Sequence, residues 1–401
     1  MQREDFLPTA PGRIDETTFA NGAHGITFIP FSLSRIHVDL SDETYRWIAE
    51  ARSALSLLQG NIAQMSSLPI VRPALLRQEA QATSRIEGTR TLLHEVVGAQ
   101  RKQKDNTELR EVMNFVNVAE TAYRYFEQVK DCPQIPINLL FQMQEELMNG
   151  MVNDSTQVGR TRTEQVFIGT KGHSIEQARF IPMPPGHDLE IALRDLIDYI
   201  NKPQHSVDPI VAIAMAHYQF ETLHPFIDGN GRLGRLLILL QLVILGQLSD
   251  PVLSISSWLE HNRNAYYGRL LRVSTHGSWN IWIRFMAKVI YHASAQTLDL
   301  IKEISSLNEH LHTQVRESNL KAETAHQVVD MAFEQLNFDS ADIQEKCNVS
   351  NQRANQILKD LSQLGIIQVQ DPSMRKNKRY TCPQITETLL RVSPSDYTIE
   401  D

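Results

Sequence analysis

The sequence predicts a mainly α-helical protein with one β-hairpin near its middle and a winged helix-turn-helix at its C-terminal end. Apolar residues recur at helical spacing over most of residues 41–320, which predicts a helical body. Two short β-like runs within residues 159–185 predict the hairpin. Residues 342–370 follow the order short helix, turn, longer helix and strand, which is typical of a winged helix.

Residues 1–40 are expected to form an irregular N-terminal arm that lies over the body. They mix proline, glycine, threonine and asparagine without a helical period. An N-terminal helical region follows over residues 41–125, where Asp42 can cap the first helix and apolar positions from Ile48 onward recur at helical spacing. Pro73 is expected to interrupt this pattern once.

The core domain is expected over residues 126–300. Within it, Gln165–Ile168 and Ala178–Ile181 predict the two strands of the hairpin, because a polar, glycine-containing loop joins them and prolines follow. An Asp-Pro pair at 208–209 then predicts the start of a strongly apolar helix, since aspartate caps and proline suits the first turn.

A linker helix over residues 301–322 and a winged-helix-like domain over residues 323–401 complete the chain. Side chains suited to bases and phosphates are Gln352, Arg353, Asn355 and Gln356 on the second helix and Arg375, Lys376, Lys378 and Arg379 in the wing. Yet twelve acidic residues face only eight basic ones in this domain, which argues against DNA binding. Protein docking and homodimer formation are the alternatives.

The overall composition is that of a soluble globular protein, with 42% hydrophobic and 21% charged residues. A formal net charge of −8 argues against a protein that coats nucleic acid through its overall field. The N-terminus has no apolar signal segment, and the longest apolar run, Leu236–Leu245, is too short to cross a membrane. Three widely separated cysteines indicate a cytoplasmic protein without structural zinc.

Twelve residues, HPFIDGNGRLGR from His224 to Arg235, combine a potential base, a carboxylate, a glycine-rich turn and two arginines. The glycines on both sides of Asn230 let backbone N–H groups approach a phosphate without obstruction. The apolar run Leu233–Leu245 predicts a helix whose N-terminal end favours the same negative charge. The pattern therefore predicts a binding site for nucleotide phosphates.

These twelve residues fit the HxFx[D/E]GNGRxxR signature of the Fic family at every position, and the chain resembles that family over residues 40–300. The resemblance implies an all-helical core that carries a β-hairpin flap. It also implies an enzyme that transfers AMP from ATP to a serine, threonine or tyrosine hydroxyl of a protein, with Mg²⁺ as the cofactor.

The resemblance assigns the reacting groups. His224 takes the proton from the attacking hydroxyl, a task that suits an imidazole because it can be neutral and basic near pH 7. Asp228 supplies an oxygen ligand for Mg²⁺ held against the phosphates.

The remaining motif residues are expected to bind the nucleotide. The backbone of Gly229, Asn230 and Gly231, with the Asn230 side chain, holds the α- and β-phosphates, and Arg232 and Arg235 reach the outer phosphates.

Tyr266 resembles the residue of the family that lies beside the nucleotide base, where its ring could stack on adenine. The alternative is packing in the core, which is the commonest role of a tyrosine on an amphipathic helix.

A second segment, Thr83–Gly88, fits the [S/T]xxxE[G/N] inhibitory motif of the same family. The resemblance implies that Glu87 pairs with Arg235 and so keeps this arginine from the γ-phosphate of ATP. Both anions compete for one guanidinium. The alternative is an ordinary surface glutamate near a helix end. A second role of Glu87 is also open: the resemblance allows a carboxylate that positions water to remove AMP from a modified protein.

The predicted hairpin corresponds in position to the flap of the family, whose exposed edge aligns an extended segment of the target protein. Ile168 and Gly169 lie at the strand end nearest the expected site. The alternative is a hairpin that only stabilises the fold.

The leading hypothesis is an autoinhibited protein adenylyltransferase whose substrates are ATP and a protein with a hydroxyl side chain. The modified protein can also be the enzyme itself. One alternative is transfer of UMP or of a phosphate by the same fold. Another is a DNA-binding regulator whose core senses a nucleotide.

Overall fold

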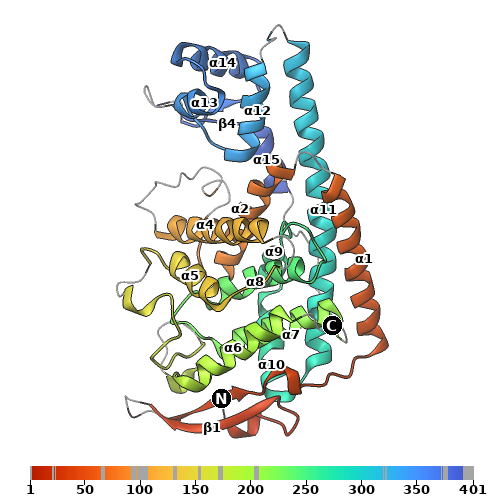
Figure 1. Cartoon of the computed structure of the whole chain (residues 1–401), viewed down its shortest axis with the longest axis vertical. Coiled ribbons are helices and arrows are strands. Elements are labelled where there is room, and N and C mark those ends of the chain that lie inside the picture. The colour runs from red at the N-terminus through yellow and green to blue at the C-terminus, as the bar shows by residue number, and fades with distance from the viewer. Residues whose placement is uncertain are drawn as a thin grey trace.

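The computed structural model is mainly helical, which confirms the predicted fold class (Figure 1). It describes residues 2–19, 22, 24–64, 68–91, 96, 107–129, 133–151, 155–169, 175–202, 207–318, 320, 323–371, 373 and 378–391. Arg375 and Lys376, two basic residues of the expected wing, lie outside these ranges.

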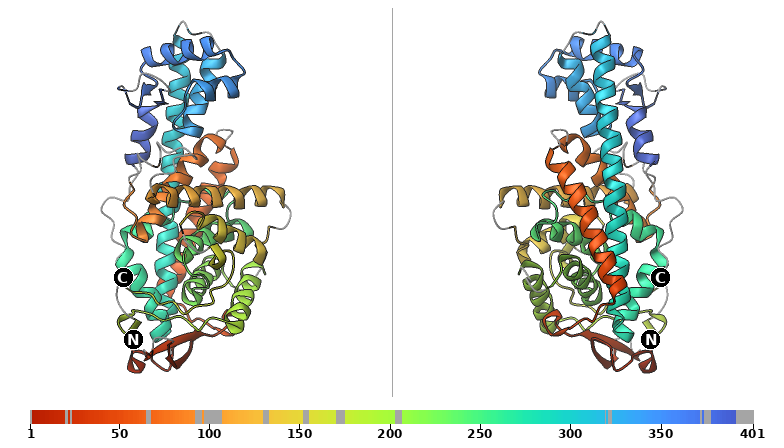
Figure 2. Two further views of the ribbon diagram at one scale, coloured as in Figure 1. Left: turned by 90° about the vertical axis from the view of Figure 1, so that its left-hand side faces the viewer. Right: turned by 90° about the vertical axis from the view of Figure 1, so that its right-hand side faces the viewer.

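Two long helices, α1 (Asp42–Gln64) and α11 (Trp279–Glu317), lie side by side along one side of the molecule (Figures 1 and 2). Their first turns are joined, because the Ser41 N–H and the Thr44 hydroxyl both donate to the Asn280 side chain at 2.9 Å. The Ser41 hydroxyl also accepts the Thr44 N–H at 3.3 Å, so Ser41 caps α1.

The body contains eight further described helices: α2 (Leu68–Ile86), α4 (Thr107–Gln128), α5 (Ile137–Leu147), α6 (His187–Asn201), α7 (Pro209–Leu223), α8 (Asn230–Ile244), α9 (Ser256–His261) and α10 (Arg263–His276). Short 3₁₀ turns cover Arg3–Asp5, Leu33–Arg35, Ser155–Gln157 and Ile175–Gln177. Helices α7 and α8 pack against each other, and nearly all of their side chains are buried. Helices without a polar face gain most from complete burial. The twelve-residue motif covers the connection between these two helices.

One predicted break in the helical pattern is absent. Pro73 lies inside α2 instead of ending a helix. It follows the start of α2 by five residues, so it removes only one backbone hydrogen bond close to the helix end. Helix α11 continues through residue 300, so the expected boundary between the core and a linker helix falls within one helix.

The N-terminal arm is not irregular. Its strands β1 (Gly12–Thr18) and β2 (His24–Pro30) form an antiparallel hairpin. Phe28 of β2 is fully buried, and its N–H donates to the Ile181 carbonyl at 3.0 Å. The prediction failed because this tertiary contact, which the composition of the arm does not reveal, stabilises the hairpin.

The central hairpin is much shorter than predicted. Ile168 and Phe180 form one antiparallel bridge, with backbone hydrogen bonds of 2.8 and 3.0 Å in the two directions. Phe28 of β2 forms a parallel bridge with Pro182, on the next part of the same segment. The predicted length of the two strands is therefore wrong. A two-stranded ribbon without a packed face is only marginally stable, which explains why the pairing is so short. We call residues 165–182 the flap; its residues 170–174 lie outside the described ranges.

The C-terminal unit contains α12 (Glu323–Gln335), α13 (Ser340–Cys347), α14 (Asn351–Gln363), β3 (Gln368–Val369), β4 (Tyr380–Thr381) and α15 (Pro383–Arg391). Asn348 has a left-handed conformation (φ 52°) and turns the chain between α13 and α14. Strand β3 pairs with β4. Helix α12 packs against α2, and α15 packs against α11. This order of elements is compatible with a winged helix, which stays a prediction.

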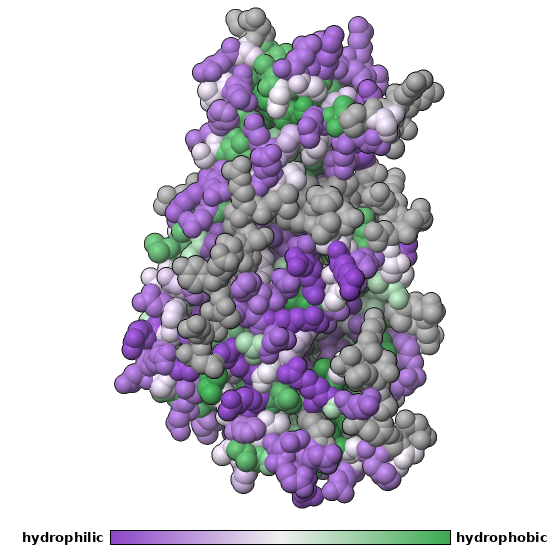
Figure 3. Space-filling model, turned by 180° about the vertical axis from the view of Figure 1, so that it is seen from behind, coloured by the Kyte–Doolittle hydropathy of each residue, from purple (hydrophilic) through white to green (hydrophobic). Residues whose placement is uncertain are grey.

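Among the described residues, the surface seen from behind is mostly hydrophilic, with small hydrophobic areas between the polar side chains (Figure 3). No helix in the described part of the chain has both the length and the apolar character needed to cross a membrane.

Candidate active site

His224 lies where α7 ends. Asp208 starts this helix, since its carboxylate accepts the Ile210 N–H at 2.8 Å, and Pro209 takes the first helical position. At the other end, His224 has a left-handed backbone conformation (φ 47°, ψ 59°), which is uncommon for a residue other than glycine. The chain therefore turns at His224 into the loop that leads to α8.

The imidazole of His224 is half-buried, and its Nδ1 lies 3.3 Å from the Glu221 carbonyl oxygen. Burial lowers the pKa of His224 to about 4; the hydrogen bond to Glu221 opposes this shift, and the positive charge of Arg162 adds to it. Because a carbonyl only accepts, Nδ1 carries the proton and Nε2 keeps its lone pair. The side chain is therefore neutral near pH 7 and can take up a proton at Nε2.

Asn230 closes the loop between His224 and α8. Its amide nitrogen donates to the Phe226 carbonyl and its amide oxygen accepts the Phe226 N–H, both at 2.9 Å. Both side chains are buried. The Asn230 amide therefore bonds the loop backbone in this conformation, and the expected contact of its side chain with a phosphate stays a prediction.

The N-terminal end of α8 presents backbone donors. Gly229 precedes the helix with a positive φ of 82°, which favours glycine. The Leu233 N–H donates to the Gly229 carbonyl at 3.0 Å, so the N–H groups of residues 230–232 come before the hydrogen-bond ladder of the helix. These donors and the helix dipole favour an anion in front of α8.

Arg235 is fully buried in α8 and contacts the C-terminal end of α2. Its Nε donates to Thr83 Oγ1 at 2.6 Å, and its Nη2 donates to the Thr83 carbonyl at 3.1 Å and to Glu87 Oε1 at 2.6 Å. Glu87 directly follows the last residue of α2, and Gly88 (φ 102°) turns the chain away. Burial alone would raise the pKa of Glu87, but nearby positive charges, Arg235 foremost, hold it below its ordinary value. Glu87 is therefore ionised at neutral pH.

The Glu87 carboxylate lies against the first turn of α8. A Cβ atom at Gly231 would lie 2.2 Å from Glu87 Oε1 and 3.0 Å from Arg235 Nη1, so only glycine leaves room for the carboxylate. An acidic side chain of this chain thus occupies the position where the donors of α8 and Arg235 favour an anion.

Arg232 is also buried, and its Nη1 lies 3.0 Å from Glu111 Oε1 on α4. Glu111 also accepts a hydrogen bond of 2.9 Å from the hydroxyl of Thr89, two residues after Glu87. Both arginines of the motif are therefore paired with carboxylates from outside the motif, and both carboxylates precede it in the chain.

Asp228 differs from these buried groups, because its side chain is 65% exposed. Its Oδ1 accepts the Gly229 N–H at 2.6 Å and lies 3.5 Å from Arg232 Nη2. No group of three or more His, Cys, Asp or Glu side chains able to hold a metal occurs among the residues that the structure describes. Mg²⁺ does not need such a cage, since one carboxylate together with substrate phosphates and water can hold it. An exposed Asp228 beside the anion site fits that role.

Tyr266 lies in the core. Its side chain is fully buried, its hydroxyl is 2.8 Å from His217 Nε2, and its ring stacks on His217 with 5.9 Å between centroids. The centroid of the Trp282 ring lies 6.1 Å from that of Tyr266. The structure thus corrects the expectation of adenine stacking: core packing is the role of Tyr266 in this conformation.

The flap leaves one edge open. Gly169 is exposed, and Phe167 is a large hydrophobic side chain with 38% exposure. The segment from Phe180 to Pro182 has Ile168 on one side and Phe28 on the other, whereas no described strand pairs with the far side of Ile168. An extended peptide could add there by β-augmentation.

Three polar residues that sequence reasoning did not identify also contact the site: Gln144, Arg162 and Glu111. Gln144 Nε2 donates to the Asp228 carbonyl at 3.2 Å, and Arg162 Nε donates to the His224 carbonyl at 2.9 Å. A single polar residue on a helix or in a loop has no spacing signal, so nothing in the sequence distinguishes these three from surface residues. Thr83 did belong to a recognised motif, but it was given no role of its own.

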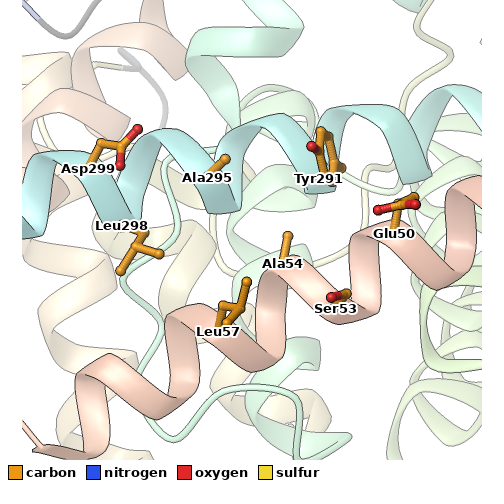
Figure 4. A pocket seen from close by; sticks show the side chains of 8 residues that line it. All are labelled: Glu50, Ser53, Ala54, Leu57, Tyr291, Ala295, Leu298 and Asp299. Carbon is orange, nitrogen blue, oxygen red and sulfur yellow. The ribbon is translucent and has the colours of Figure 1, made fainter.

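A groove lies between α1 and α11, apart from the motif (Figure 4). Its lining residues are Glu50, Ser53, Ala54, Leu57, Tyr291, Ala295, Leu298 and Asp299. No residue of the twelve-residue motif lines it, so the groove has no role in the site described above.

Comparison with known proteins supports the resemblance found in the sequence. Residues 134–242 match the Fic/DOC family, and residues 45–124 match the N-terminal region of the same family. The solved structure of a Fic family protein from Desulfovibrio desulfuricans G20 superposes with a TM-score of 0.53 at 21% identity, covering 86% of this chain and 97% of that one. This second likeness shows the fold alone.

Two curated relatives are adenylyltransferases by name. "Protein adenylyltransferase fic-1" of Caenorhabditis elegans is 32% identical over 160 residues, which are 40% of this chain and 28% of that protein. "Protein adenylyltransferase Fic" of Drosophila mojavensis is 32% identical over 148 residues, which are 37% of this chain and 25% of that protein. The matches span only about a quarter of the length of these relatives.

Proposed function

Since this chain belongs to the Fic/DOC family, we propose that it is a protein adenylyltransferase, which transfers AMP from ATP to a hydroxyl side chain of a protein. The observation that carries the proposal is the position of a neutral histidine, His224, on the loop that leads into an anion site. That site consists of the first turn of α8 and the buried Arg235. The names of the relatives support the same activity.

In this reaction the target hydroxyl oxygen attacks the α-phosphorus of ATP, and the bond from that phosphorus to the bridging oxygen of the β-phosphate breaks. Pyrophosphate leaves with the bonding electrons, and His224 Nε2 takes the hydroxyl proton. The backbone donors of α8 and the two arginines stabilise the charge that develops on the phosphates. A Mg²⁺ ion bound by Asp228 and the phosphates would neutralise part of the same charge.

We also propose that the described conformation is restrained. Glu87 holds Arg235 and lies against Gly231, so a γ-phosphate cannot reach the same guanidinium without displacing the carboxylate. ATP would bind with its outer phosphates displaced, and the α-phosphorus would not be in line with the target hydroxyl. In-line attack requires accurate placement, so this misplacement slows transfer.

Isotopic labelling distinguishes AMP transfer from its alternatives. The Glu87→Gly variant is incubated with a cell lysate and with ATP labelled at either the α- or the γ-phosphate. Label from the α-position, and none from the γ-position, is expected on protein. Retained γ-label would show phosphate transfer instead, and label from α-labelled UTP but not from ATP would show UMP transfer.

The pH dependence of transfer should reflect the low pKa of His224. Because burial lowers this pKa to about 4, the imidazole stays neutral down to about pH 5, and the rate constant at saturating ATP should change little between pH 8 and pH 5.5. Below about pH 5 protonation removes the base and the rate falls. A profile of kcat for the Glu87→Gly variant tests this, and a half-maximal rate near pH 6.5 would contradict it.

Gly231→Ala tests the position of Glu87 without any assay of activity. In the wild-type chain the new Cβ meets the carboxylate at 2.2 Å, so the substitution should destabilise the protein by about 1–3 kcal/mol. In the Glu87→Gly background this contact is gone and alanine favours the helix, so the same substitution should be neutral or slightly stabilising. Thermal unfolding of the four proteins measures the difference; equal losses in both backgrounds would show that Glu87 does not lie there.

A further inference from the structure

Arg162, just before the flap, is a buried cation whose three side-chain hydrogen bonds all go to backbone carbonyl oxygens. The side chain is only 1% exposed. Burial lowers the pKa of Arg162 to about 10, so the guanidinium remains charged at neutral pH. A buried cation is costly unless its donors are satisfied, which indicates that these carbonyl contacts are what holds it in place.

The three carbonyls belong to three different segments. Arg162 Nε donates to His224 at 2.9 Å, Nη1 donates to Glu164 at 3.1 Å, and Nη2 donates to Met183 at 2.5 Å. Glu164 and Met183 lie on the two sides of the flap, and His224 begins the loop of the motif. One planar guanidinium thus joins both sides of the flap to the residue that carries the base.

The backbone around Arg162 strengthens this connection. The Arg162 N–H donates to the Pro225 carbonyl at 2.9 Å. Three residues earlier, the Gly159 N–H donates to Gln144 Oε1 at 2.6 Å, and Gln144 Nε2 donates to the Asp228 carbonyl at 3.2 Å. The segment 159–162 is therefore connected to the loop near both of its ends.

His224 needs such support, because its backbone has a left-handed conformation, which is unfavourable for a residue with a Cβ. Its carbonyl accepts the Arg162 hydrogen bond in this conformation. Without that hydrogen bond, the His224 backbone could rotate out of the left-handed conformation, and this rotation would move the imidazole.

We propose that Arg162 is a positioning residue for AMP transfer, which fixes the backbone of His224 relative to the flap. The base and a target hydroxyl aligned along the flap then meet at reacting distance. This inference rests on the proposed function. Lysine cannot replace the guanidinium fully. The three carbonyl oxygens lie in three fixed directions that suit a planar guanidinium, whereas the ammonium group of lysine is not planar.

The test compares Arg162→Met and Arg162→Lys in the Glu87→Gly background. Loss of the three bonds should lower kcat about 100-fold in the methionine variant, with a smaller loss in the lysine variant. Affinity for ATP should stay within about threefold of the parent by calorimetry, because the anion site at α8 does not contain Arg162. Arg160→Met removes an exposed cation from the same segment and should leave kcat unchanged.

A second readout does not depend on transfer. Amide hydrogen exchange of residues 224–230 should accelerate about tenfold in Arg162→Met, whereas residues 236–244 of α8 should exchange as in the parent. If the parent transfers no AMP, the proposed function fails, and this exchange pattern still decides whether Arg162 holds the loop.

Two results would overturn the inference. The first is that the methionine variant has the same kcat as its parent and the same rates of amide hydrogen exchange at residues 224–230. The second is faster amide hydrogen exchange throughout the core of both variants, together with a loss of ATP affinity as large as the loss of kcat. This result would mean that Arg162 stabilises the whole fold and does not specifically position His224.

Discussion

Replacing Glu87 with glycine is expected to raise the rate of AMP transfer about 100-fold, the scale on which misplacement of reacting groups slows an enzyme. In the described conformation Arg235 donates to Glu87 Oε1 at 2.6 Å, and the carboxylate is ionised. Removing it frees Arg235 for the γ-phosphate. Initial rates with α-labelled ATP, on the protein itself and on lysate proteins, measure the effect.

Glu260→Gly provides a matched control. Glu260 pairs with Arg85 of the same helix end at 3.2 Å, but neither side chain contacts the motif. Its removal also deletes a carboxylate from an ion pair near α2, and it should leave the rate unchanged. If Glu87→Gly were no faster than wild type, or if both variants were equally faster, Glu87 would not be a specific restraint.

His224→Ala in the Glu87→Gly background is expected to lower transfer by about 10²–10⁴-fold, the range for loss of a general base. The imidazole is neutral near pH 7 and its Nε2 can accept the hydroxyl proton. The anion site at α8 is intact in the variant, so calorimetry should show ATP binding close to that of the parent.

His187→Ala serves as the control for removal of a histidine, because His187 is exposed at the start of α6 and should not affect transfer. A His224→Ala variant with more than a tenth of the activity of its parent would mean that another group, or water, takes the proton.

The sequence was sufficient for the features that depend on local pattern. The fold class follows from apolar periodicity, and the family follows from twelve consecutive residues, His224–Arg235. Short-range chemistry also determines the start of α7, where Asp208 caps the helix and Pro209 takes the first helical position.

Features that depend on contacts distant in the chain were not predictable. The N-terminal hairpin is stabilised by the hydrogen bond from Phe28 to Ile181, more than 150 residues away, so its composition alone indicated an irregular arm. The residue pattern also does not reveal that the Asn230 amide bonds the Phe226 backbone. The position of Tyr266 on a helix likewise does not show that its side chain is fully buried.

The central claim is that Glu87 and the γ-phosphate compete for Arg235, and comparison of ATP with ADP measures this competition directly. Calorimetry should give nearly equal affinities of the wild-type protein for the two nucleotides, since Glu87 holds the arginine. The Glu87→Gly variant should bind ATP about 5- to 150-fold more tightly than ADP, the usual range of coupling between two sites. Replacing Arg235 by methionine in that variant should remove the preference. The same ATP-to-ADP ratio in the wild-type protein and in Glu87→Gly would contradict the claim.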